Sequence, residues 1–237
     1  MKFYTNVQLI GNQFLVRGVE NGKRYEHRDE FFPTLFVKSK KNLKTKYKTL
    51  SGESVEEIKP GTVRECRDFY KKYEDVEGFE IYGNDRYIYQ YISEKYPEDE
   101  VKFDISKIKL VTLDIETTSE QGFPDVQSCS EEILAITIQD YTTKQIITWG
   151  SKPFNNKQKN VTYHHCPTEY ELLTSFINYW MQDVPDVITG WNIQFFDIPY
   201  ICRRLDRVLG EKLMKRFSPW GLVSEGEVHI MGRTHIT

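Results

Sequence analysis

Two carboxylates stand at the end of an apolar run near the middle of the chain. Residues 108–118 read IKLVTLDIETT, which places Asp114 and Glu116 two positions apart. Alternate side chains of a strand share a face, so we expect these two to point the same way, about 6.5 Å apart. Like charges that close repel each other and resist removal from water, and a divalent cation would relieve the conflict. The pair is open to two interpretations: a metal or catalytic site, or a strand that simply runs out into solvent.

The spacing alone is not specific, because the chain contains a second copy of it. Asp75 and Glu77 also flank one apolar residue, but the surrounding sequence KKYEDVEG is charged and ends in Gly78. Charged flanks and a glycine are typical of a solvated helix end or loop. We therefore expect no site at Asp75 and Glu77. The interpretation of Asp114 and Glu116 depends on whether a third carboxylate joins them.

Asp197 is the candidate for that third carboxylate. It precedes a stripe of apolar residues at helical spacing, and Pro199 suits the first turn of a helix, where a missing N–H has little cost. The N-terminus of a helix favours an ionised carboxylate. Taken alone, Asp197 is more simply interpreted as the N-cap of that helix.

A sheet is needed to position these acids. The run 108–115 is β-branched or leucine at almost every position, which predicts a central strand buried on both faces. Apolar runs at 133–138 and 145–149 follow after short connections, so the three strands are most simply an antiparallel meander. A short fourth strand at 187–189 is expected to lie parallel beside the first, which would bring Asp197 towards the carboxylate pair.

Two helices complete this α/β domain. Thr168 and Glu171 match a capping box that opens the first helix, and Pro185 ends it. The second helix begins at Asp197. The residues expected in the core are Leu172, Leu173, Phe176, Ile177 and Trp180 from the first helix, and Ile198, Ile201, Leu205, Val208 and Leu209 from the second.

The sequence of the amino-terminal part predicts a small antiparallel sheet. Three short segments joined by glycine-containing turns are expected to be strands, at residues 3–10, 13–19 and 23–28. The dipeptide Asn21-Gly22 is a strong hairpin signal. Residues 31–37 are expected to add an edge strand, because Pro33 lacks a donor for the ladder.

A helix and two more strands are expected before the first domain ends. Thr62 and Glu65 match a capping box for a helix that runs to about Tyr73. Residues 79–82 and 87–92 have the pattern of strands. The tyrosines of these segments form either one packed sheet face or a base-stacking platform: Tyr82, Tyr87, Tyr89 and Tyr91.

A polar break at residues 96–100 marks the expected boundary between two domains. The first, residues 1–100, is a small, mixed, β-rich domain. The second, residues 101–237, is the α/β domain that carries the acids.

Composition is that of a globular protein and has no overall basic signature of a nucleic-acid binder, which neither supports nor excludes contact with nucleic acid through local patches. The 237 residues are 39% hydrophobic and carry a formal net charge of −3. Residues 38–48 contain six lysines and are either a solvated loop or a patch that contacts phosphates. Arg203, Arg204 and Arg207 are expected on the surface.

The sequence gives no sign of export or of a membrane span. The four cysteines are far apart and form no CxxC pair, which is typical of reduced thiols. The amino terminus has no apolar signal-peptide core, and no run approaches the roughly 18 apolar residues of a membrane helix. We therefore expect a protein that is not secreted and has no membrane partner.

Taken together, the motifs resemble the first two exonuclease motifs of family B DNA polymerases. Residues 114–116 are similar to the motif Asp-Ile-Glu, and residues 192–197, NIQFFD, to Asn-x-x-x-Phe-Asp. TGWN at 189–192 and MKRFSP at 214–219 resemble the polymerases of T4-like bacteriophages, and FPTLF at 32–36 resembles the family's Pro-Thr-hydrophobic strand. The resemblance covers nearly all of this chain but only the first part of such a polymerase.

The resemblance implies a 3′–5′ proofreading exonuclease with an RNase H-like (DnaQ-type) fold. Its site would hold two Mg²⁺ or Mn²⁺ ions, with Asp114 bridging both, Glu116 on the side of the attacking water and Asp197 on the other ion. Hydrolysis of a phosphodiester needs a nucleophilic water and a stabilised leaving oxygen, which two ions about 3.5–4 Å apart supply together.

The resemblance also implies contacts with DNA. Asn192 would hydrogen-bond to the strand being degraded, and Phe196 belongs to the same motif. Phe123, in a Gly-Phe-Pro loop, could stack on an unpaired base, although packing is the commoner role of such a phenylalanine. The implied partners are single-stranded or primer–template DNA and the remainder of the polymerase, in the same or a second polypeptide, in the cytoplasm of an infected host cell.

The chain departs from the family pattern after Asp197. A third motif, Tyr-x-x-x-Asp, is expected further along, but no acid after Asp197 follows a tyrosine at that spacing, and no polymerase motif is present. We therefore expect an exonuclease domain truncated before its third motif, part of a DNA-directed DNA polymerase, and leave open whether the isolated chain is an enzyme. The alternative is a non-catalytic nucleic-acid-binding or assembly module that docks to a separate polymerase chain.

Overall fold

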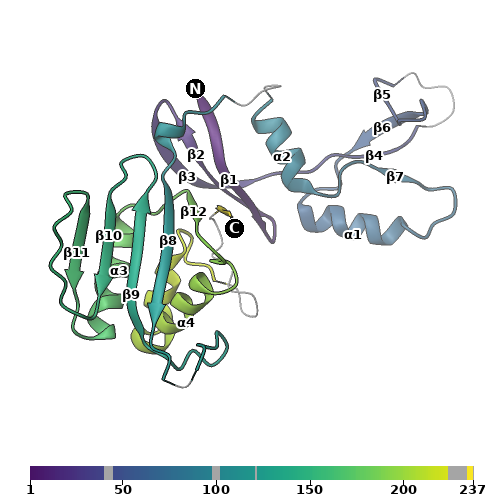
Figure 1. Cartoon of the computed structure of the whole chain (residues 1–237). Helices are drawn as coiled ribbons and strands as arrows, with labels where there is room; N and C mark the ends of the chain where they lie inside the picture. Colours follow the sequence, from purple (N-terminus) through teal and green to yellow (C-terminus); the bar gives the residue numbers. More distant parts are fainter. Residues whose placement is uncertain (40–44, 98–101, 121, 224–233, 237) are drawn as a thin grey trace. The chain divides into compact units, whose positions relative to one another are not determined.

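The computed structural model describes residues 1–39, 45–97, 102–120, 122–223 and 234–236. The chain divides into two compact units, Met1–Phe103 and Asp104–Thr237, which are described separately (Figure 1). Among the described residues, no helix is both long enough and apolar enough to cross a membrane.

The first unit begins with a three-stranded antiparallel sheet in the order β1-β2-β3. The strands are β1 (Lys2–Ile10), β2 (Gln13–Glu20) and β3 (Lys23–Glu30). Gly11, Asn21 and Gly22 have positive φ angles of 61°, 52° and 76°, the left-handed conformation that a tight hairpin turn requires. The two predicted hairpins are confirmed.

A four-stranded sheet follows in the order β5-β6-β4-β7. Its strands are β4 (Leu35–Lys38), β5 (Tyr47–Lys48), β6 (Ser54–Ile58) and β7 (Ile81–Tyr82). The prediction that residues 31–37 form an edge strand was wrong, because β4 pairs with β6 on one side and β7 on the other. The strand starts at Leu35, so Pro33 lies outside the ladder and removes no donor from it.

Helix α1 (Val63–Tyr73) confirms the predicted capping box. The Thr62 side chain accepts a hydrogen bond from the backbone N–H of Glu65, and the Glu65 carboxylate accepts one from the N–H of Thr62. Val63 and Cys66, on its inner face, are buried in one core with Phe14 of β2 and Leu35 of β4. The core of the first unit therefore spans both of its sheets.

Residues 87–92 are not a strand but belong to helix α2 (Tyr87–Lys95). Tyr87 and Tyr91 are four positions apart, so they share one face of the helix and are buried, while Tyr89 is 54% exposed. Tyr91 stacks on Phe14 with ring centroids 4.7 Å apart. The alternating tyrosines thus form neither a sheet face nor a stacking platform, because packing against the sheet selects the helical period.

The second unit is built on a six-stranded sheet in the order β11-β10-β9-β8-β12-β13. Strands β8 (Leu110–Thr117), β9 (Ile133–Asp140) and β10 (Ile146–Gly150) form the predicted antiparallel meander. Strand β12 (Val187–Thr189) lies parallel beside β8, as predicted. Two strands were not predicted, β11 (Val161–His165), parallel to β10, and β13 (Thr234–Ile236), parallel to β12.

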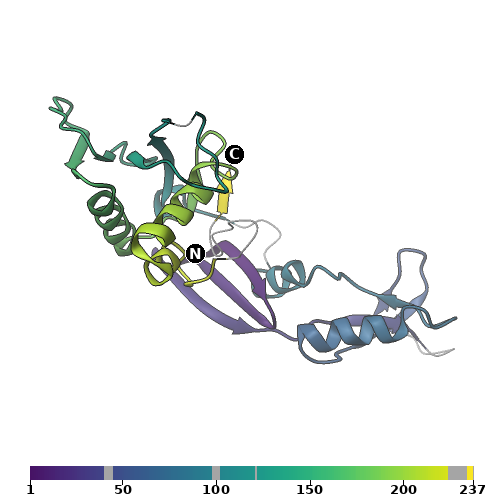
Figure 2. The same ribbon diagram turned by 90° about the horizontal axis from the view of Figure 1, so that it is seen from below.

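Helices cover one face of this sheet (Figures 1 and 2). They are α3 (Glu169–Gln182), α4 (Asp197–Leu209) and the short α5 (Glu211–Met214), with single 3₁₀ turns at η1 (Ile105–Lys107) and η2 (Lys215–Phe217). The predicted capping box of α3 is present at Thr168 and Glu171, and all five residues predicted for its apolar face are buried. The mixed sheet with its helical layer agrees with the predicted RNase H-like α/β fold.

Strand β8 is not buried on both faces as predicted. Val111, Leu113 and Ile115 are buried, but the alternate side chains of Thr112, Asp114 and Glu116 are exposed. The reason is that the helices pack on one face only, so the odd-numbered residues face the core and the even-numbered ones face solvent. The carboxylate pair therefore lies on the open face of the sheet.

Candidate active site

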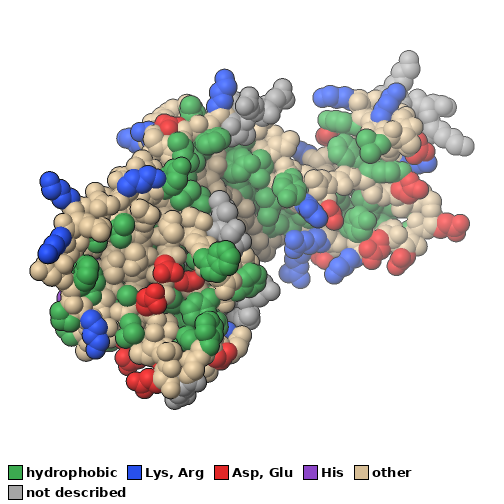
Figure 3. Space-filling model, in the orientation of Figure 1, with side chains coloured by type: hydrophobic (Ala, Val, Ile, Leu, Met, Phe, Trp, Pro, Cys, Tyr) green, Lys and Arg blue, Asp and Glu red, His purple; other side chains and the backbone are tan. Residues whose placement is uncertain are grey.

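Asp114 and Glu116 stand side by side on the open face of β8. In the antiparallel register Asp114 lies opposite Thr137 and Glu116 opposite Ala135, so small side chains surround both carboxylates. The space-filling view shows acidic side chains gathered near the middle of this face, with hydrophobic side chains beside them (Figure 3). The pair is solvated, and its mutual repulsion is weaker than at a buried site.

Asp197 reaches β8 at the point where the neighbouring strand has stopped. Strand β12 ends at Thr189, which pairs with Thr112, and the N–H of Ile115 three residues further on donates to Oδ1 of Asp197 at 3.1 Å. This bond places the carboxylate next to the residue between Asp114 and Glu116. The N-cap interpretation of Asp197 was wrong, since the N-cap position is Phe196 and Asp197 is the first helical residue.

The close approach depends on the turn between β12 and α4. A Cβ atom added at Gly190 would stand 2.5 Å from the carbonyl oxygen of Leu113, so a larger residue would push the turn off β8. Asn192 has a φ angle of 53°, and its carbonyl oxygen accepts hydrogen bonds at 3.0 Å from the N–H groups of Phe195 and Phe196. This tight turn directs the first residue of α4 onto the strand.

Burial and charge both act on Asp197, whose side chain is 4% exposed. Burial, together with the negative charges of Asp114 and Glu116, raises the pKa of Asp197 to about 6, although hydrogen bonds from backbone N–H groups oppose the rise. In the absence of a cation, this carboxyl group therefore keeps its proton to a higher pH than an ordinary aspartate does. Bound positive charge would stabilise its ionised form.

The three acids match the donor chemistry of a hard divalent cation but are not arranged as a closed metal cage. Carboxylate oxygens are the ligands that Mg²⁺ and Mn²⁺ prefer. Within the described ranges, however, no three His, Cys, Asp or Glu side chains are grouped closely enough to hold a metal ion. Asp114 and Glu116 are exposed on the open face, whereas Asp197 is turned onto the N–H of Ile115.

Aromatic residues lie on both segments that border the acids. Phe123 is 88% exposed, and its ring centroid is 5.6 Å from that of Phe196, which in turn packs 5.4 Å from Tyr200. Asn192 is exposed on the turn before α4. The structure thus brings the residues predicted to contact DNA onto two neighbouring segments.

Two exposed aromatic residues of the turn received no role from the sequence. Trp191 is 92% exposed and Phe195 69% exposed. Single exposed apolar side chains are normal on a protein surface, whereas several that lie together often mark a site that binds another molecule. Their only signal in the sequence is their place inside the motif-bearing segment.

The loop that carries Phe123 is tied to helix α4 by arginines that were expected on the surface. Arg204 is 5% exposed, forms an ion pair with the buried Glu169 and donates to the carbonyl oxygen of Cys129 at 2.9 Å. Arg203 and Arg207 donate to carbonyl oxygens of the same segment, at Gln127 and Ser128. The expectation was wrong for Arg204, because the buried carboxylate of Glu169 and the carbonyl oxygen of the buried Cys129 hold its guanidinium inside the unit.

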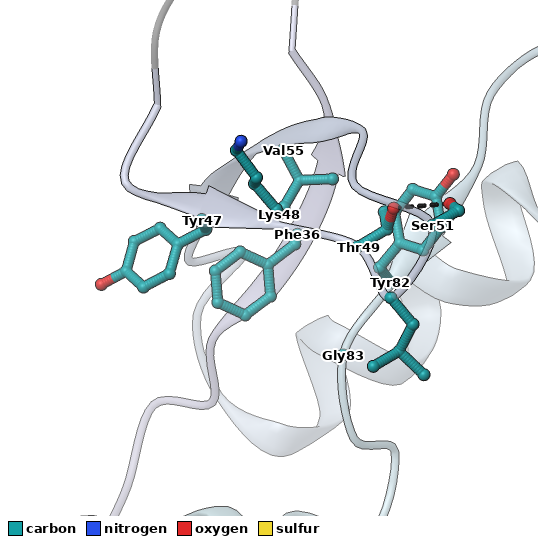
Figure 4. A pocket seen from close by; sticks show the side chains of 9 residues that line it. Phe36, Tyr47, Lys48, Thr49, Ser51, Val55, Tyr82 and Gly83 are labelled. Carbon is teal, nitrogen blue, oxygen red and sulfur yellow. Dashed lines mark hydrogen bonds between the residues drawn. The ribbon is translucent and has the colours of Figure 1, made fainter.

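The first unit has a pocket of its own beside the lysine-rich run (Figure 4). It has a volume of about 580 Å³ and is lined by residues that include Phe36, Tyr47, Lys48 and Tyr82. The rings of Phe36 and Tyr47 lie 5.0 Å apart, edge to face. Of the six lysines of residues 38–48, Lys40, Lys41 and Lys44 lie outside the described residues, and Lys38 is paired with Glu53 at 2.7 Å.

Comparison with known proteins relates this geometry to an enzyme family. Residues 69–236 match the family described as DNA polymerase family B, exonuclease domain. The matched range contains Asp114, Glu116 and Asp197.

Individual relatives point to the same group of enzymes. The chain is 32% identical to the DNA-directed DNA polymerase of Enterobacteria phage T4 over 94% of its length, and 30% identical to that of Escherichia phage RB69 over 92%. The DNA polymerase catalytic subunit of human herpesvirus 6A is 29% identical over 41% of the chain. The chain spans 27% of the length of each of the two phage polymerases.

Proposed function

Because this chain belongs to DNA polymerase family B, whose exonuclease domain it contains, we propose that Asp114, Glu116 and Asp197 form part of a metal-dependent 3′–5′ proofreading site acting on single-stranded DNA ends. The observation that carries the proposal is the 3.1 Å bond from the N–H of Ile115 to Asp197, which holds the third carboxylate beside the other two. Acids from two distant segments converge there, whereas the second Asp-x-Glu copy has no such third member within the part of the chain that the structure describes.

The roles proposed for the residues follow from where they stand. Asp114 and Glu116, whose side chains are exposed, would hold the metal ions from the open face, and Asp197 would hold them from the position beyond the end of β12. Two bound ions would make a water nucleophilic and stabilise the leaving 3′ oxygen. Asn192 would hydrogen-bond to the strand, and Phe123 and Phe196 would stack on its last bases.

The proposed site needs a segment that these residues do not supply. Two or three carboxylates and several waters hold Mg²⁺ weakly, and the ion relies on substrate phosphates to complete its shell. The phage relatives are much longer than this chain, which spans 27% of each. We propose that a segment with a Tyr-x-x-x-Asp motif, in the remainder of the polymerase, completes the site and that the full enzyme proofreads during DNA synthesis.

A complementation assay tests the proposal. The chain is mixed with a polymerase fragment that carries Tyr-x-x-x-Asp, and 5′-labelled single-stranded DNA is followed with Mg²⁺ or with EDTA. We expect stepwise shortening from the 3′ end that EDTA and Asp114→Ala abolish, while the matched control Asp75→Ala leaves it unchanged. The chain by itself should be very poor at cleavage, because losing one member of a cooperating site costs nearly as much as losing all.

Robust cleavage by the purified 237 residues that survives Asp114→Ala would show that the active site lies elsewhere. Failure of every mixture to cleave, with DNA binding intact, would favour the second candidate, a non-catalytic nucleic-acid-binding or assembly module. The observation in favour of that candidate is the pocket of the first unit, where Phe36 and Tyr47 lie beside Lys48. Aromatic rings next to lysine side chains suit single-stranded nucleic acid.

A further inference from the structure

The far edge of the second unit's sheet carries a basic segment without a single acid. Residues 141–168 contain no Asp or Glu, and no longer acid-free stretch occurs in the sequence. The segment contains four exposed lysines: Lys144, Lys152, Lys157 and Lys159. Among the described residues, none of the four forms an ion pair. Figure 3 shows Lys and Arg side chains spaced along the outer edge of this unit.

The loop that carries three of these lysines has a defined conformation. It connects β10 to β11, and Nδ2 of Asn156 donates to the carbonyl oxygens of Gln158 and Val161 at 3.0 and 2.5 Å. Nδ2 of Asn160 donates to the carbonyl oxygen of Lys144 at 3.2 Å, and the Tyr163 hydroxyl donates to that of Lys152. Hydrogen bonds at both ends of β11, a strand about 13 Å long, therefore fix the backbone of the segments that carry the lysines beside this edge.

An exposed aromatic ring accompanies the lysines. Phe154 is 62% exposed and packs edge to face on Tyr163 with centroids 5.4 Å apart. Tyr163 in turn lies against Gly150, where any Cβ atom would collide with the ring. The strand register carries this pair onto the open face, since Tyr163 pairs with Thr148, Thr148 with Thr137 and Thr137 with Asp114. Three strand spacings, about 14 Å, separate the ring from the acids.

We propose that this edge, formed by Lys144, Lys152, Phe154, Lys157 and Lys159, binds the phosphates and one unpaired base of a single-stranded nucleic acid. Exposed lysines gathered beside one edge neutralise phosphates without reading sequence. An exposed ring adds stacking, which requires a base that is not paired and so favours a single strand over a duplex. The nature of the ligand rests on the proposed action on DNA, but the binding itself needs no metal.

Lysines beside an edge strand have a simpler use, which is to keep the edge from pairing with another chain. That role explains charge near β11 but not an acid-free run of this length or the exposed Phe154. It also makes a different prediction, because removing such lysines would cause self-association and leave nucleic-acid binding unaltered.

The test is an anisotropy titration of the full chain with fluorescein-labelled oligothymidylate in EDTA, over a series of salt concentrations. The triple variant Lys152→Glu, Lys157→Glu, Lys159→Glu is expected to bind at least 10-fold more weakly, with a salt slope smaller by about 2. Phe154→Ala is expected to bind about 5- to 100-fold more weakly with an unchanged salt slope, and Phe154→Trp to restore binding.

A matched control reverses the same number of charges elsewhere, at the exposed lysines Lys71, Lys107 and Lys212. It should bind nearly as the unmodified chain does. Equal losses in the control triple, no loss in the edge triple, self-association in place of lost binding, or no measurable binding by the unmodified chain would each overturn the proposal. The exonuclease proposal is judged by metal-dependent cleavage and stands or falls independently.

Discussion

The chain contains the same three-residue pattern twice, and the two copies have different surroundings. Asp75-Val76-Glu77 follows α1 in a turn, where Val76 is 46% exposed and both acids are exposed. Asp114-Ile115-Glu116 lies in β8, where Ile115 is 7% exposed and its N–H binds Asp197. The acids are exposed in both copies, so they do not distinguish them. The residue between the acids does, because it is buried in one copy and exposed in the other.

The residue between the two acids determines whether an Asp-x-Glu pair is anchored to the rest of the fold. In β8 the side chain of Ile115 enters the core while its backbone N–H holds a carboxylate from another element. In the turn, the N–H of Val76 donates to the local carbonyl oxygen of Tyr73, three residues before it. A pair becomes a candidate site when its strand is anchored and a third acid is delivered to it.

The largest difference between the copies should appear in stability. Ile115→Ala is expected to lower the free energy of unfolding by about 2–5 kcal/mol, because it leaves a cavity in the core of the second unit. Val76→Ala, at an exposed position, should change it by less than about 0.5 kcal/mol. Urea denaturation, monitored by circular dichroism, measures both changes. Equal losses of stability would show that Ile115 does not anchor its acid pair more firmly than Val76 does.

The glycines next to the two copies should differ in which substitutions they tolerate. Gly190→Ala is expected to cost about 1–3 kcal/mol, because the added Cβ meets Leu113, and Gly190→Asn should cost more. Gly78, with a φ angle of 76° and open space around it, should tolerate asparagine, which adopts the left-handed conformation readily. Thermal denaturation of the three variants measures these losses, and the prediction is wrong if asparagine is the better replacement at Gly190.

Asp197→Asn should stabilise the metal-free chain at neutral pH. The pKa of Asp197 is raised to about 6 in the folded state, above the unfolded value of about 3.9, so its ionisation disfavours folding. Its contribution to stability is full below about pH 4 and is lost as the pH rises through 6. The variant should therefore exceed the unmodified chain by about 1–2 kcal/mol at pH 7.5 and match it near pH 4.

Melting curves across this pH range measure the difference. Asp75→Asn is the control at the exposed copy and should show no such pH dependence. A gain for Asp197→Asn that is equally large at pH 4 would mean that its origin is packing rather than charge.

The smallest effect should be metal binding by the chain alone. Because Mg²⁺ and Mn²⁺ keep several waters and the three acids do not enclose a cation, the affinity should be weak. Manganese added to the isotopically labelled chain should broaden the amide signals of Asp114 and Glu116 before those of Asp75 and Glu77. If Asp114→Ala leaves the broadening unchanged, the ion binds elsewhere.

Much of the fold could be predicted because its signals are local. The capping boxes at Thr62 and Thr168 and the hairpin at Asn21 depend on residues within a few positions of each other, and all three are confirmed. The prediction of a strand at residues 87–92 was wrong because, over so short a run, alternating tyrosines fit a strand and one face of a helix about equally well. Contact with Phe14 decides between them, and Phe14 is far away in sequence.

The sequence by itself determined the second unit's three-strand meander and the parallel fourth strand, since both depend on the type and spacing of neighbouring residues. The grouping of Asp197 with Asp114 and Glu116 came from the resemblance to a family, and their role as metal ligands stays a prediction. Only the tertiary structure decided which face of β8 is open, because the pattern of an apolar strand does not reveal on how many faces helices will pack. It also decided that Asp197 binds the N–H of Ile115 rather than capping its own helix. That N–H is available because β12 stops at Thr189, and where a neighbouring strand stops is set by the packing of the turn that follows it.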